Sequence, residues 1–120
     1  VHSADGLDEI SIAAETYVAE YKDGSLDEYV LLPESYFTER QSLDGLSVEN
    51  ASDSLELILS AFNGDAKKAQ DLIVLNSGAA LYVSGFASTI QKGIDLARQA
   101  IDTGMASEKM SELIALTNDL

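Results

Sequence analysis

Two adjacent carboxylates, Asp8 and Glu9, are the side chains of this sequence whose type and spacing best suit chemistry. They lie near the start, in the stretch VHSADGLDEISI. Magnesium takes one or two carboxylates, keeps several waters and completes its octahedron with phosphate oxygens of a substrate. The alternative is a solvated acidic turn that binds nothing, because motifs this short often match by chance. Spacing alone leaves both interpretations open.

The position of the pair depends on where the first strand ends. Neighbouring residues of a strand point to opposite faces, so Asp8 and Glu9 can converge on one ion only outside a strand. We expect Val1 to Ala4 to form the end of a strand and Asp5-Gly6 to form a turn. The pair then lies in a loop at the carboxyl end of that strand, where open α/β sheets bind ligands.

Other reactive side chains offer less. His2 is the single histidine, and the chain has no cysteine, so the sequence supports neither a catalytic triad nor thiolate chemistry. We interpret His2 as a strand residue held by packing. Lys67 and Lys68 are the only adjacent basic pair, and we expect them to face solvent rather than to bind phosphate.

Composition limits the possible partners. The 120 residues contain 21 Asp and Glu against seven Lys and Arg, which gives a formal net charge of -14. Such a chain repels nucleic-acid backbones and anionic lipid surfaces, so we expect neither as a partner. The absence of cysteine is typical of a reducing compartment, and we expect a cytoplasmic protein. Because the first residue is Val1 rather than Met, we also expect the chain to be part of a longer protein.

A β-hairpin is predicted from Thr16 to Leu32. Its turn is Asp23-Gly24, a dipeptide that favours two-residue hairpin turns. This register pairs hydrophobic side chains on one face, which we expect to be buried, and pairs acids on the other. The pairs are Tyr17 with Val30, Tyr21 with Leu26, and Glu20 with Asp27.

Four helices are predicted after a connecting segment at residues 33–50. The first carries Leu55, Ile58, Leu59 and Phe62 at helical spacing, is capped by Ser52 or Asp53, and ends at Asn63-Gly64. The second is capped by Asp65 and is apolar on nearly every side from Leu72 to Val83, so we expect it to be the buried central helix. The third follows a capping box formed by Ser88 and Gln91, and the fourth begins near Ser107. We expect an α/β chain with no boundary between two separate cores.

Several blocks of the sequence resemble anthranilate phosphoribosyltransferases. The opening stretch is similar to the family pattern Val-His-Gly-x-Asp-Gly-Leu-Asp-Glu-Ile-Ser. Further blocks follow in the family's order across nearly the whole chain. They are VAEYKDG, ENA at Glu49 to Ala51, LNSGAALYVSG at Leu75 to Gly85, GIDLARQAIDTG and LIALTN.

The resemblance implies the fold and the activity of a longer protein. Residues 1–120 correspond to the C-terminal part of a phosphoribosyltransferase/nucleoside phosphorylase-like catalytic α/β domain, without the N-terminal helical domain. The implied reaction is magnesium-dependent transfer of phosphoribosyl from phosphoribosyl pyrophosphate to anthranilate in tryptophan biosynthesis. Asp8 and Glu9 match the family's metal-binding pair, which holds the pyrophosphate through the metal. The full-length protein is expected to be a homodimer, and the isolated chain is expected to be inactive.

The chain also departs from the family. Ala13-Ala14-Glu15-Thr16 stands where the family has Thr-Gly-Pro-Thr, and Ser3 replaces a glycine. The family's Gly-Thr-Gly-Gly-Asp loop, Lys-His-Gly-Asn stretch and anthranilate-contacting residues have no counterpart here, so no catalytic residue is assigned. Two alternatives remain, a pyrimidine nucleoside phosphorylase-like enzyme and a free-standing acidic interaction module.

Overall fold

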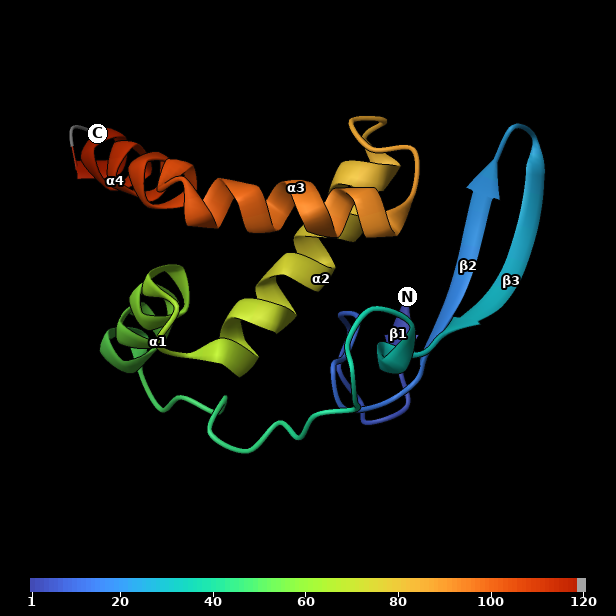
Figure 1. Cartoon of the computed structure of the whole chain (residues 1–120), viewed down its shortest axis with the longest axis horizontal. Helices are drawn as coiled ribbons and strands as arrows, with labels where there is room; N and C mark the ends of the chain where they lie inside the picture. The colour runs from blue at the N-terminus through green and yellow to red at the C-terminus, as the bar shows by residue number, and fades with distance from the viewer. Residues whose placement is uncertain (119–120) are drawn as a thin grey trace. The chain divides into compact units, whose positions relative to one another are not determined.

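The chain forms two compact units. A computed structural model describes residues 1–118, and its units are Val1–Ser47 and Val48–Leu120. Figure 1 shows strands in the first unit and helices in the second. We expected no boundary between two cores, whereas the chain divides into its two units within the predicted connecting segment. That segment is polar and turn-rich, and such composition is typical of unit boundaries.

The first unit contains a three-stranded antiparallel sheet in the order β1-β2-β3. Its strands are β1 (His2–Ser3), β2 (Thr16–Lys22) and β3 (Ser25–Leu31). Asp23 and Gly24 connect β2 to β3 with φ angles of 51° and 84°, the positive values that a two-residue hairpin turn requires. The predicted register is confirmed, because Tyr17 pairs with Val30, Tyr21 with Leu26, and Glu20 with Asp27.

The predicted burial of the hydrophobic hairpin face is wrong. Tyr21 is 76% exposed and Leu26 is 63% exposed, and Tyr17 and Val30 are also exposed. A sheet face is buried only by a second layer packed on it, whereas the main element contacts of β2 are with its neighbouring strands β1 and β3. Within residues 1–118, no helix is packed closely on the face that carries Tyr21 and Leu26, so this face stays exposed.

The core of the first unit lies at the base of the hairpin. The loop between β1 and β2 contributes Ile10 and Ile12, and the end of β3 contributes Leu31. A short 3-10 helix, η1 (Pro33–Ser35), follows β3. The segment after it returns to the loop, where the Gln41 backbone N–H donates to the Ile12 carbonyl oxygen at 3.0 Å. The β1–β2 loop is thus held from two sides.

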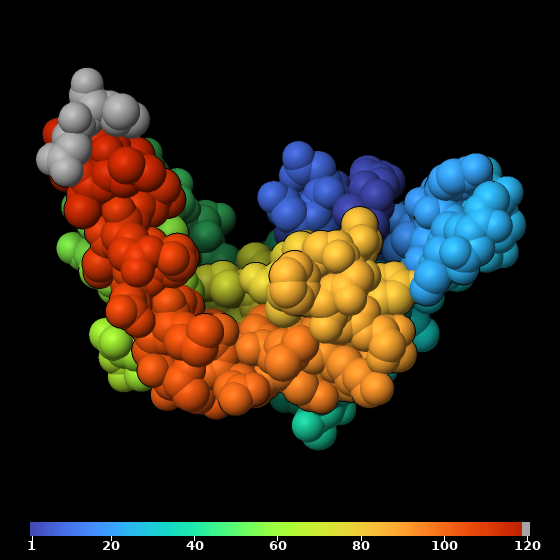
Figure 2. All heavy atoms as spheres, turned by 90° about the horizontal axis from the view of Figure 1, so that it is seen from above, coloured from blue at the N-terminus to red at the C-terminus, as the bar shows by residue number. Residues whose placement is uncertain are grey.

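The second unit contains four helices, as the sequence predicts. They are α1 (Ala51–Asn63), α2 (Lys67–Val83), α3 (Ile90–Asp102) and α4 (Met105–Asn118). In Figure 2 the atoms of α3 and α4, drawn in orange and red, form one continuous surface. The predicted end of α1 is confirmed by Gly64, which takes the left-handed conformation.

The predicted N-terminal caps are wrong. Asn50, rather than Ser52 or Asp53, caps α1 by accepting a hydrogen bond from the Asp53 N–H. Thr89, rather than the Ser88 and Gln91 pair, caps α3 by accepting from the Lys92 N–H. No side chain caps α2, which Asp65 was expected to do. In the first two cases the cap is a nearby polar residue that can also cap a helix and whose backbone is extended.

Helix α2 shares the centre of its unit with α3, which contacts all three other helices, and only one face of α2 is buried. It packs mainly against α3 and also against α1. Val74 and Leu75 are fully buried, whereas Val83 at its C-terminal end is exposed. Gly78 of α2 and Gly93 of α3 lie at the crossing, where the two backbones approach closely because neither residue has a Cβ atom. Within residues 1–118, no helix is long and apolar enough to cross a bilayer.

Candidate functional site

The two predicted site residues lie together in the loop that connects β1 to β2. Asp8 and Glu9 are both exposed, as binding to a phosphate-bearing ligand requires. They are followed by three consecutive buried residues, Ile10, Ser11 and Ile12. The chain has left the strand well before Asp8, which confirms the expectation that the pair lies in a loop.

Backbone hydrogen bonds close this loop at its base. The Ser3 N–H donates to the Leu7 carbonyl at 2.9 Å, and the Ala4 N–H donates to the Glu15 carbonyl at 2.9 Å. Gly6 takes a φ of 94°, which few other residues adopt without strain, and its N–H donates to the Ser3 carbonyl. The predicted turn at Asp5-Gly6 is therefore present, and it directs the chain toward the acid pair.

The side chain of Asp5 adds contacts that the sequence analysis did not identify. Its Oδ2 accepts a hydrogen bond from the Ser11 hydroxyl at 2.6 Å, and its Oδ1 accepts one from the Leu7 N–H at 3.3 Å. Partial desolvation raises the pKa of the Asp5 carboxyl, but hydrogen bonds from Ser11, Ser3 and the Leu7 backbone outweigh it and hold that pKa below its usual value. Asp5 is thus a carboxylate that the loop itself stabilises. The only sequence signal for this role was an aspartate before a glycine in a turn, which is common.

The donor set of the loop fits magnesium bound together with a phosphate ligand. Within residues 1–118, no group of three His, Cys, Asp or Glu side chains is arranged to hold a metal ion. Asp8 and Glu9 therefore offer a partial coordination sphere, which suits an ion that keeps waters and takes the remaining oxygens from a substrate. A protein-only site for a tightly held structural metal would need more ligands.

Basic side chains are scarce around the pair. Lys22 and Arg40 are the only lysine and arginine residues of the first unit. Arg40 forms an ion pair with Glu34, with 2.8 Å between the Arg40 Nε and the Glu34 Oε1. A phosphate-bearing ligand at this loop would therefore need a metal ion, or cations from outside residues 1–47, to neutralise its charge.

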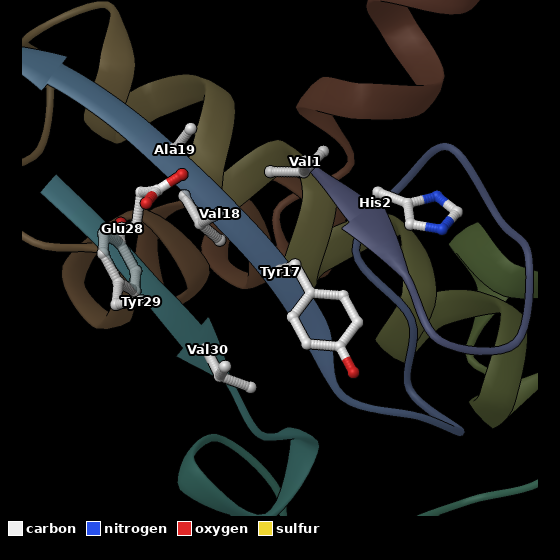
Figure 3. A pocket seen from close by; sticks show the side chains of 8 residues that line it. All are labelled: Val1, His2, Tyr17, Val18, Ala19, Glu28, Tyr29 and Val30. Carbon is white, nitrogen blue, oxygen red and sulfur yellow. The ribbon is translucent and has the colours of Figure 1, made fainter. Parts of the chain in front are cut away.

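A shallow hollow of about 490 Å³ on the sheet does not include the acid pair. Figure 3 shows its lining side chains, which come from the three strands and from Val1, just before β1. His2 lies at this hollow, but its side chain is exposed, so the prediction that packing holds His2 is wrong. The alternation along β1 explains this, because it turns the neighbouring Ser3 inward, where that residue is fully buried.

The adjacent lysines of the second unit do not form a free cationic site. Lys67 Nζ lies 2.8 Å from Asp71 Oδ1, and both terminal guanidinium nitrogens of Arg98 lie 3.3 Å from the same oxygen. Asp71 is buried, so these two cations compensate a carboxylate that joins α2 to α3. We assign this cluster to the stability of the helical unit.

Comparison with known proteins places this geometry in context. The family described as "Glycosyl transferase family, a/b domain" matches residues 1–107. A protein of Ectopseudomonas mendocina named anthranilate phosphoribosyltransferase is 52% identical over 121 residues, covering 98% of this chain and 35% of that protein. A protein of the same name from Cellvibrio japonicus is 51% identical and covers 100% of this chain and 36% of its own length. Another from Stutzerimonas stutzeri is 48% identical and covers 98% of this chain and 35% of its own length. The chain thus spans about a third of the relatives it matches.

Proposed function

Because the chain belongs to the glycosyl transferase family and matches the a/b domain of that family, we propose that it is part of an anthranilate phosphoribosyltransferase. The observation that carries the proposal is the identity of about half of all residues to proteins of that name, sustained over nearly the whole chain. The exposed acid pair in the β1–β2 loop supports it, because the donor set suits a reaction that releases pyrophosphate. The product would enter tryptophan biosynthesis.

The proposed reaction joins phosphoribosyl pyrophosphate to anthranilate. The bond between ribose C1 and the pyrophosphate oxygen breaks, and a bond forms between C1 and the amine nitrogen, which loses a proton. Bound magnesium would neutralise the negative charge that grows on the leaving pyrophosphate. In this chain Asp8 and Glu9 would hold that ion, and the buried segment that follows them would fix where the two carboxylates stand.

The role of the chain in this reaction is electrostatic rather than acid–base. Asp8 and Glu9 are both exposed, so their carboxylates are available to hold a metal ion. The anthranilate-contacting residues of the family have no counterpart in this sequence. We therefore assign the residues that bind anthranilate, and the acceptor of its amine proton, to the remainder of the full-length protein. We expect that protein to be a cytoplasmic homodimer.

A direct assay tests the proposal. The full-length protein is incubated with anthranilate, phosphoribosyl pyrophosphate and magnesium, and both the loss of anthranilate fluorescence and the release of pyrophosphate are followed. We expect equal amounts of anthranilate consumed and pyrophosphate released, with no phosphorolysis of a pyrimidine nucleoside in a parallel reaction with inorganic phosphate. Phosphorolysis without anthranilate turnover would indicate a nucleoside phosphorylase instead. Turnover of neither substrate would favour an interaction module.

A further inference from the structure

The carboxylate of Asp5 connects the two sides of the loop that carries the acid pair. Its Oδ1 accepts from the Leu7 N–H at 3.3 Å, immediately before Asp8. Its Oδ2 accepts from the Ser11 hydroxyl at 2.6 Å, two residues after Glu9. One side chain therefore brackets the exposed acid pair and limits how far the segment between its two contacts can move.

Ser11 is itself fixed to the sheet. Its N–H donates to the Thr16 hydroxyl oxygen at 3.2 Å, and its own hydroxyl oxygen accepts from the Ala13 N–H at 2.9 Å. Ser11 and Thr16 are almost fully buried, and Thr16 is the first residue of β2. The Asp5–Ser11 contact thus ties the acid-bearing loop to a rigid element rather than to another mobile segment.

Both oxygens of Asp5 are already used within the protein. A carboxylate that accepts from two protein donors on opposite sides of a loop is suited to shaping that loop. Asp8 and Glu9 are exposed, which leaves their oxygens available to a ligand. The three acids of this short stretch are thereby divided between two roles, one internal and two external.

We propose that Asp5, acting through Ser11, is a positioning residue that presents Asp8 and Glu9 to the metal–pyrophosphate group. This inference rests on the proposed function. Magnesium demands a nearly ideal octahedron, so two flexible carboxylates must be held in a defined arrangement to bind it together with a substrate. Residues that orient metal ligands typically change metal affinity by about 10- to 100-fold when they are removed.

The experiment measures binding rather than turnover. Isothermal titration calorimetry gives the affinity of the full-length protein for phosphoribosyl pyrophosphate at a series of magnesium concentrations. We expect Asp5→Ala and Ser11→Ala each to raise the magnesium concentration for half-maximal affinity by about tenfold. The double variant should be no worse than the more affected single variant, because both residues act through one contact. Asp27→Ala, which removes the same charge from an exposed position on β3, is the matched control and should change nothing.

Two further measurements keep the outcomes distinct. Thermal unfolding is recorded for every variant, and Asp5→Asn replaces Asp5→Ala if the latter does not fold. An Asp5 or Ser11 variant that melts earlier but has an unchanged magnesium requirement would show a purely structural role and overturn the inference. Asp8→Asn and Glu9→Gln report on the proposed function itself. If these two variants alter the magnesium requirement and the Asp5 and Ser11 variants do not, only the positioning role fails. If neither Asp8→Asn nor Glu9→Gln has an effect, both the magnesium role of the acid pair and the positioning role of Asp5 lose their basis.

Discussion

Replacing Gly93 by alanine should destabilise the helical unit, although alanine is the better helix former. A Cβ atom at Gly93 would lie 2.1 Å from the Gly78 carbonyl oxygen and 2.8 Å from the Gly78 carbonyl carbon. These are backbone atoms of α2, so they cannot rotate away as a flexible side chain could. The substitution therefore requires α2 and α3 to move apart along their shared contact.

The two opposing effects differ in size. Alanine in a helix interior is favoured over glycine by about 1 kcal/mol. Forcing an extra carbon into a well-packed contact costs about 1–3 kcal/mol, and a backbone clash at this distance belongs at or above the upper end. We expect a net loss of about 2 kcal/mol in the free energy of unfolding.

Urea unfolding followed by circular dichroism, on the full-length protein, provides the measurement. Gln99→Ala on the exposed face of the same helix is the control, and we expect it to change stability by less than about 0.5 kcal/mol. If Gly93→Ala proves more stable than the parent by about 1 kcal/mol, helix propensity alone governs this position. The close approach of α2 and α3 would then be wrong.

Three further predictions concern the core, the loop and the exposed surface. Leu75→Asp places an unpaired charge where the side chain is fully buried, and it should abolish the cooperative unfolding transition seen by calorimetry. The pKa of the Asp5 carboxyl is lowered in the folded state, so its contribution to stability is present above the unfolded pKa and is lost as pH falls below about 4. Ser11→Ala removes one of the hydrogen bonds that lower this pKa, so it should weaken the acid dependence in unfolding curves recorded between pH 6 and pH 3. The 120-residue chain alone should bind a hydrophobic dye or self-associate, because Tyr21 and Leu26 are exposed, and a compact monomer without dye fluorescence in light scattering would contradict this.

Features set by neighbouring residues could be predicted from the sequence. The Asp23-Gly24 dipeptide fixes the hairpin register because its positive φ angles match a two-residue turn. Gly64 ends α1 for a similar local reason. Apolar spacing likewise indicated four helices. Each of these features depends on an interaction within a few residues.

Features set by distant contacts could not be predicted. Burial of the Tyr21 face depends on whether a second layer packs on it, and nothing in the hairpin sequence specifies that layer. The capping residue among neighbouring candidates depends on which backbone is extended, as Asn50 and Thr89 show. The Asp5–Ser11 contact spans six residues and relies on a loop shape that only the folded chain provides. The acid pair itself was identified from its residue types and from the family resemblance.

The central claim is that Asp8 and Glu9 hold the magnesium that neutralises the leaving pyrophosphate. The most direct test is steady-state formation of phosphoribosyl anthranilate by the full-length protein across a magnesium titration, for the parent, Asp8→Asn and Glu9→Gln. Loss of such a charge contact costs on the order of 3 kcal/mol, or about a hundredfold in rate. We expect both variants to turn over about a hundredfold more slowly and to need more magnesium, with an unchanged unfolding midpoint because both side chains are exposed. Variants that match the parent at every magnesium concentration would show that the two acids form only a solvated turn.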